Sequence, residues 1–144
     1  MNYGTECYTI DSDATVRIFQ SRWFQRFSRK EGIADAALRE AVVRADKGQI
    51  DADLGGEVIK QRIARPGQGR SKGYRTIILF RRGEKAFFVY GFSKSQRVNI
   101  DDDEEHQFKE AAKHVLALTE KQLAKLVKRG DFTEVKANEQ KLSK

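Results

Sequence analysis

The sequence contains very little cysteine, proline or histidine. Its one cysteine, Cys7, has no partner for an internal disulfide, as is usual for proteins of a reducing cytoplasm. One proline and eleven glycines in 144 residues argue against a long disordered chain. No apolar run approaches the roughly 18 residues of a membrane span, and the first residues contain acids and no apolar core, so we expect no signal peptide. These absences predict a soluble, cytoplasmic protein.

The side chains that metal sites and common hydrolases require are also scarce. The two histidines, His106 and His114, are eight positions apart and have no cysteine nearby, which does not fit a zinc site. Residues 101–105 are all acidic, but consecutive carboxylates point in several directions instead of converging on Mg²⁺. We interpret them as the acidic start of a helix and a solvated face. No Ser/His/acid or Cys/His arrangement supports acyl chemistry, and we expect neither a metal nor a cofactor.

The sequence does contain a local excess of positive charge. Residues 58–97 hold eleven Lys or Arg against the single acid Glu84, a net charge of +10, whereas the whole chain carries +7. Cations on strands are often only a solvated face, but ordinary surfaces mix both signs. We therefore interpret this segment as a phosphate-binding surface, with nucleic acid or an acidic protein as the partner.

Alternating and β-branched residues predict strands in the same segment. Within residues 59–63, alternation places Lys60 and Arg62 on one face and the two isoleucines on the other. Residues 82–85 have the composition of a tight turn, so the apolar runs on either side of them should pair as an antiparallel hairpin. The expected strands are residues 15–19, 59–63, 77–80 and 87–90. The expected sheet has an apolar back and a cationic front.

Helical patterns lie before and after these strands. Ser21 suits the N-cap of a helix through Lys30 that Gly32 ends, with Trp23 among the aromatic residues on one side of it. From Asp35, apolar residues recur at the spacing of one helix face. A last helical region has acids at its start and cations near its end, which complements the helix dipole. The second helical region covers residues 35–48. The last covers residues 101–130 and could be interrupted near Thr119.

Together these elements predict an α+β fold: a small twisted, mainly antiparallel sheet of about four strands, two N-terminal helices and a C-terminal helix. We expect one domain over residues 15–130, an irregular lead-in at 1–14 and a charged, frayed tail at 131–144. Residues 51–56 are expected to form a turn. Residues 66–73 contain three glycines but lack the spacing of a nucleotide-binding loop, and a strand follows them, so we interpret them as a mobile basic loop beside a groove.

A cationic groove without a conventional base restricts the phosphodiester chemistry. RNA supplies its own nucleophile in the 2′-hydroxyl, and cations can stabilise the charge that develops at the phosphate. A lysine whose pKa is lowered by neighbouring like charges could accept the proton. If the protein is a nuclease, RNA is the favoured substrate.

The order of the elements and two motifs resemble the RelE/ParE superfamily of bacterial toxins, and more narrowly its phage-derived RelE-like branch. The resemblance covers residues 15–120 and depends on two stretches of sequence. The first runs from Arg65–Gly67 to Tyr74–Ile77 and includes a Gly-Tyr-Arg sequence, and the second is Phe87–Lys94. It implies a toxin of a type II toxin–antitoxin system that cleaves messenger RNA, usually in the ribosomal decoding site. It also implies a cognate antitoxin as a partner, and inhibited translation and growth.

The resemblance also implies site residues. The catalytic cations of the ribonuclease branch match Lys60, Arg62 and Arg75. The best-known members have a further Arg and a Tyr that are missing here. Ser95 stands where the Arg is expected, and Ile100 or Asp101 stands where the Tyr is expected. Arg97 or Tyr90 could substitute for them. The further candidates for RNA binding are Arg65, Arg70, Lys72, Tyr74, Arg81, Tyr90, Lys94 and Arg97. The two tyrosines have an equal alternative as structural residues of the sheet.

Two other functions fit parts of the sequence. Members that lack the catalytic set, the ParE-like toxins, inhibit DNA gyrase instead, and the missing Arg and Tyr favour this reading. The retained Lys60, Arg62 and Arg75 speak against it. A plain RNA-binding module is the third alternative, and the small number of aromatic residues on an alternating strand face makes it less attractive.

Overall fold

A single sheet organises the computed structural model, which describes residues 16–65 and 69–136 of the chain. Its strands follow the order β2–β3–β4–β5–β1–β6. Neighbouring strands are antiparallel, except for β1 and β5, which run parallel. The strands are β1 (Arg17–Ser21), β2 (Ala52–Gly55), β3 (Val58–Arg65), β4 (Gly69–Arg81), β5 (Lys85–Ser93) and β6 (Phe132–Val135). The predicted hairpin is confirmed, since β4 and β5 pair across the turn at residues 82–84.

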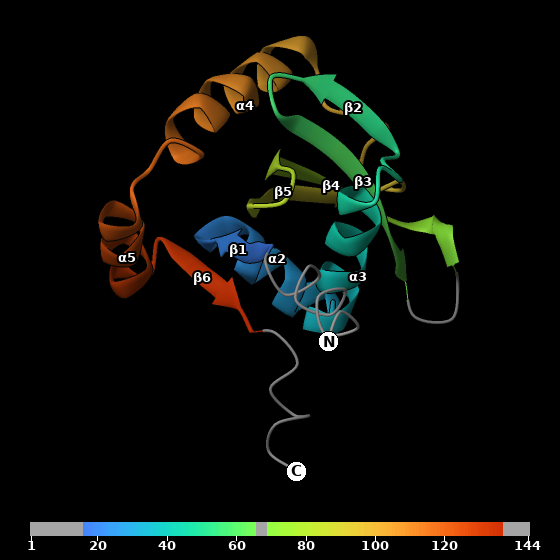
Figure 1. Cartoon of the computed structure of the whole chain (residues 1–144). Coiled ribbons are helices and arrows are strands. Elements are labelled where there is room, and N and C mark those ends of the chain that lie inside the picture. Colours follow the sequence, from blue (N-terminus) through green and yellow to red (C-terminus); the bar gives the residue numbers. More distant parts are fainter. Residues whose placement is uncertain (1–15, 66–68, 137–144) are drawn as a thin grey trace, which may run out of the picture.

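Helices cover both faces of the sheet (Figure 1). One core lies under α2 (Arg22–Glu31) and α3 (Asp35–Asp46) and includes Phe24, Leu38 and Phe88. The other lies under α4 (Asp102–Val115) and α5 (Glu120–Arg129) and includes Phe19, Ile77, Phe87 and Leu123. The fold is therefore α+β as predicted, but with a six-stranded sheet in place of four strands.

The predicted helix ends are confirmed by their caps. The Ser21 hydroxyl accepts a hydrogen bond from the backbone N–H of Phe24 at 3.1 Å, and Gly32 ends α2 in the left-handed region. Asp101 and Glu104 form a capping box at the start of α4. The break near Thr119 is also real, because Thr119 caps α5 in the same way, with Gln122 as its partner.

Three segments differ from the prediction. Within residues 51–56, expected as a turn, Ala52–Gly55 form edge strand β2, whose Asp and Gly content conceals it in the sequence. Residues 69–73 of the expected loop already belong to β4, because Gly69 pairs with Arg65. Phe132–Val135, expected in the frayed tail, pair with β1, and the Phe132 ring packs on Phe87 at 5.1 Å between centroids. Residues 66–68, the expected lead-in at 1–14 and residues 137–144 of the tail lie outside the described residues.

The sheet also lacks the fully cationic front that alternation predicted. Val58, Ile77 and Leu79 lie in the core beneath α4, on the same face as Lys60. The alternation predicted for β3 is correct. The packing of α4 over part of this face was not predicted, because α4 belongs to a distant part of the chain. Lys60, Arg62 and Arg75 lie on the part of this face that α4 leaves uncovered.

Gly73 is the glycine of the Gly-Tyr-Arg motif, and a close backbone contact explains why a glycine is needed there. A Cβ atom at this position would lie 1.9 Å from the carbonyl oxygen of Ile63 on β3. The two strands approach closely here because their register shifts between Ile63 and Arg65. The motif thus begins at a backbone contact that admits only glycine.

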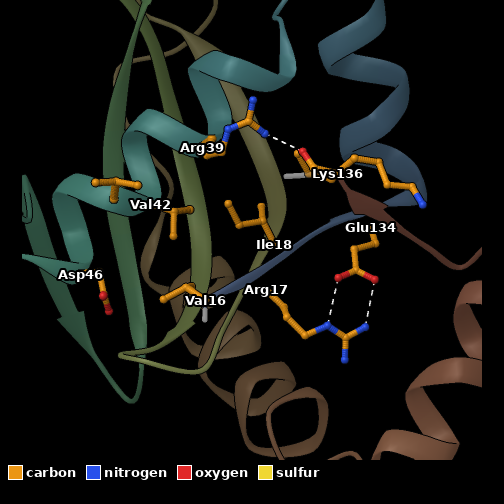
Figure 2. A pocket seen from close by; sticks show the side chains of 10 residues that line it. Val16, Arg17, Ile18, Arg39, Val42, Asp46, Glu134 and Lys136 are labelled. Atoms are coloured by element: carbon orange, nitrogen blue, oxygen red, sulfur yellow. Dashed lines mark hydrogen bonds and ion pairs between the residues drawn. The ribbon is translucent and has the colours of Figure 1, made fainter. Parts of the chain in front are cut away.

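A cavity of about 230 Å³ lies between α3 and the paired strands β1 and β6 (Figure 2). Val16, Ile18 and Val42 contribute to its apolar lining. At its rim, the Arg17 guanidinium donates two hydrogen bonds of 2.9 Å to the Glu134 carboxylate. Because β6 is four strands from β3 in the sheet, this cavity is remote from the basic strand.

Gln61 ties β3 to α3 and is fully buried. Its amide nitrogen donates to the carbonyls of Ala41 at 3.0 Å and Gln49 at 3.1 Å, and its oxygen accepts from the N–H of Asp51 at 2.7 Å. We predict that Gln61→Leu, which strands three backbone groups, lowers the free energy of unfolding by about 3 kcal/mol.

Urea denaturation measures this loss. The matched control is Gln107→Leu on the exposed side of α4, which should change the free energy of unfolding by no more than about 0.5 kcal/mol. Equal stabilities of the two variants would show that the buried hydrogen bonds contribute nothing.

Candidate functional site

The structure brings Lys60, Arg62 and Arg75 together on one face of the sheet. Arg62 lies directly opposite Arg75 across the β3–β4 pair, and Lys60 lies opposite Ile77. Opposed residues of neighbouring strands point to the same side, and Ile77 belongs to the core under α4. The three cations, named the cationic cluster from here on, therefore share the α4 face.

The cationic cluster lies where that face is open to solvent. Leu79 is buried with Ala112 and Leu116 of the α4 region, whereas 43% of the Arg62 side chain is exposed. Like charges directly opposite each other on a sheet are unfavourable. An anion bound between Arg62 and Arg75 would relieve this repulsion. The geometry therefore suits a phosphate.

Asp51 holds the backbone of the cluster in place. Its carboxylate accepts a hydrogen bond from the N–H of Arg62 at 2.7 Å and lies 3.5 Å from the Arg44 guanidinium. Burial alone would raise the pKa of Asp51, but the N–H of Arg62 and the charges of Arg44 and Arg62 lower it below its usual value. The carboxylate is thus ionised at neutral pH and fixes the position of Arg62.

Asn99 connects Lys60 to the loop after β5. The Lys60 ammonium donates to the Asn99 side-chain oxygen at 3.0 Å, and the Asn99 carbonyl accepts from the Arg97 guanidinium at 2.9 Å. Asn99 was not found from the sequence, because a single asparagine in a loop carries no pattern. It places Arg97 beside the cationic cluster.

Arg97 and Tyr90, the expected substitutes for the missing Arg and Tyr, contact each other. Arg97 donates to the Tyr90 hydroxyl at 3.1 Å and lies over the Phe92 ring, 5.7 Å from its centroid. It also donates to both oxygens of Glu104, at 2.7 and 3.0 Å. The hydrogen bond from Arg97 lowers the pKa of Glu104. Glu104, expected only as part of the acidic helix start, therefore also orients Arg97.

Three of the remaining candidates, Arg65, Tyr74 and Arg81, contact residues outside the cationic cluster. Tyr74 is 2% exposed on the opposite face, where its hydroxyl donates to Glu31 at 3.0 Å and the Arg65 guanidinium lies over its ring. Its surroundings fit the structural alternative. Arg81 lies at the other end of β4 and is paired with Glu57 through two hydrogen bonds of 2.9 Å. Lys72 and Lys94 are exposed, and the side chain of Arg70 lies outside the described part.

Within residues 16–65 and 69–136, no three His, Cys, Asp or Glu side chains gather as a group that could hold a metal ion. Over the same ranges, no helix has the length and apolar character needed to cross a bilayer.

The family comparison covers the whole sheet. The family model described as the RelE toxin of the RelE/RelB toxin–antitoxin system matches residues 16–135, from the start of β1 to the end of β6. No curated protein matches the sequence at a significant level. The narrower likeness to a phage-derived branch stays a prediction. Because the match spans most of the chain and the whole sheet, this protein belongs to the RelE toxin family.

Proposed function

We propose that this toxin cleaves messenger RNA on the ribosome, without a metal ion, and so inhibits translation and growth. The observation that carries the proposal is the cationic cluster, in which Lys60, Arg62 and Arg75 meet on two adjacent strands at an open end of the sheet. The three side chains are cations, which can bind a phosphate directly. Membership of a toxin family supports the same conclusion.

The proposed reaction uses the 2′-hydroxyl of the RNA. Its oxygen attacks the adjacent phosphorus atom while Lys60, acting in its neutral amine form, accepts the hydroxyl proton. The bond from phosphorus to the 5′-oxygen of the next nucleotide breaks, and that oxygen is protonated by solvent. Arg62 and Arg75 stabilise the negative charge that grows on the phosphate oxygens during the attack. The products are a 2′,3′-cyclic phosphate and a 5′-hydroxyl end.

Arg97 is the proposed fourth cation of the site. It reaches the cluster through Asn99 and is held by Glu104 and Tyr90. A guanidinium fixed by a carboxylate is preorganised, so it needs no rearrangement when charge develops on the substrate. In this proposal Arg97 takes the place of the arginine that Ser95 replaces.

An antitoxin is the partner that the family implies. A free cluster of this charge would bind nucleic acids without specificity. We propose that the antitoxin either covers the cationic cluster or holds the C-terminal helices, and that the ribosome is the second partner.

Removal of the Arg75 guanidinium should abolish toxicity without unfolding the protein. Loss of a group that stabilises transition-state charge costs about 3–4 kcal/mol, or a few hundredfold in rate. We therefore predict that Arg75→Ala, and equally Lys60→Ala, fold, bind the antitoxin and no longer arrest growth. Mapping of new messenger RNA 5′ ends after induction measures cleavage, and melting temperatures measure the fold.

The control is Lys128→Ala, on the exposed side of α5, which should remain fully toxic. Wild-type toxicity of Arg75→Ala would remove Arg75 from the mechanism. Growth arrest by the unsubstituted protein with intact messages and altered DNA supercoiling would favour the gyrase function and refute cleavage.

The chemistry makes a second prediction about the substrate. A message that carries one 2′-deoxynucleotide immediately 5′ of the cleaved bond lacks the nucleophile, so ribosomes programmed with it should show no cut at that bond. The same message with the 2′-deoxynucleotide three positions away should be cut normally. Cleavage of the first message would indicate attack by water and would exclude the 2′-hydroxyl mechanism.

A further inference from the structure

A groove of about 500 Å³ lies between α2 and the C-terminal half of β5. It exists because β1 pairs with β5 only as far as Phe88, and the chain then turns directly into α2. The edge of β5 after Phe88 therefore faces a helix instead of a strand. Its lining includes Trp23, Arg26 and Lys30 from α2, Tyr90 and Phe92 from β5, and Arg97.

Trp23 presents an aromatic surface in this groove. It is 45% exposed, and Val98 is the only other exposed large apolar residue in the described part of the chain. Its ring contacts Tyr90 at 4.7 Å and Phe27 at 5.4 Å between centroids. These contacts hold the indole in one orientation, although much of its surface remains in water. Such a rigid, exposed aromatic ring suits a flat ligand.

The charges of the groove favour a polyanion. Arg26, Lys30 and Arg97 line it, and Glu31 is its one acid. Glu31 accepts a hydrogen bond from the Tyr74 hydroxyl, whereas Arg26 and Lys30 form no ion pair with any described residue. An aromatic surface beside cations is the composition of grooves that bind single-stranded nucleic acid.

The groove is continuous with the cationic cluster. Phe92, which lines the groove, is the direct cross-strand neighbour of Arg75. Arg97 lines the groove as well and is linked to Lys60 through Asn99. A strand whose phosphate lies at Arg75 can therefore pass over Arg97, which covers the buried Phe92 ring, toward Trp23.

We infer that this groove binds an unpaired base of the RNA whose phosphodiester lies at the cationic cluster. The base packs on the exposed part of the Trp23 ring, and Arg26 and Lys30 bind the phosphates beside it. Trp23 is thus a substrate-binding residue of the toxin. The inference rests on the proposed function, because the strand that is cleaved supplies the base.

The test uses the full-length protein, freed of antitoxin, and a single-stranded 2′-O-methyl RNA octamer, which has no free 2′-hydroxyl to attack. Trp23 is the only tryptophan of the chain, so its fluorescence reports on the groove alone. The octamer should quench this fluorescence saturably. By anisotropy of a labelled octamer, Trp23→Ala should bind roughly ten- to a hundredfold more weakly, and Trp23→Phe should recover most of the affinity.

A second pair of variants tests the phosphate contacts. Arg26→Gln should lower the slope of log affinity against log salt by about 0.7, the value for one phosphate contact on a single strand. Arg29→Gln is the matched control, because Arg29 lies on the same helix but does not line the groove. Its slope should equal that of the unsubstituted protein.

The outcomes separate this inference from the proposed function. Equal octamer affinity of Trp23→Ala and the unsubstituted protein, with messages still cut, overturns the groove and leaves the function intact. Loss of antitoxin binding by Trp23→Ala at unchanged RNA affinity makes the groove a protein-binding surface and also overturns the inference. Quenching by the octamer without any cleavage of messages supports the groove and refutes the nuclease.

Discussion

The register between β3 and β4 determines where the three cations of the cationic cluster lie. It places Arg62 opposite Arg75 and Lys60 opposite Ile77, so the three cations share one face with the α4 core. A slip of one residue would turn the cations of β3 to the other face. Gly73 secures the register, because the Ile63 carbonyl occupies the space that a side chain would need. Gln61 secures it from the other face through its buried hydrogen bonds.

Local chemistry predicted the elements whose signals lie within a few residues. Ser21, Gly32 and Thr119 were identified as helix ends because caps depend on neighbouring backbone groups. Strand β2 was missed because Asp53 and Gly55 are poor strand formers. Strand β6 was missed because its four residues follow a helix and pair with β1, at the other end of the described chain. The packing of α4 on one face of the sheet was missed for the same reason, because it joins segments that are distant in sequence.

In the candidate site, too, residues with a local sequence pattern were predicted, and contacts between separate segments were not. Alternation in β3 identified Lys60 and Arg62, and the Gly-Tyr-Arg motif identified Arg75. The bond from Lys60 to Asn99 and the contact of Trp23 with Tyr90 join segments that are far apart in sequence, and no periodic pattern encodes such pairs. Glu104 is close to Arg97 in sequence, but their contact crosses from a loop to a helix and has no periodic pattern either. The count of charges also included Arg65 and Arg81, which have partners elsewhere on the sheet. Arg65 lies over the Tyr74 ring, and Arg81 forms an ion pair with Glu57.

The position of β1 between β5 and β6 has a consequence for synthesis of the chain. The site strands β3, β4 and β5 are consecutive and pair through short connections, whereas β1 needs Lys85–Phe88 on one side and Phe132–Val135 on the other. Such distant pairings form late, because closing a long loop costs entropy before any contact repays it. The sheet is therefore completed only after residue 135 has left the ribosome that makes it.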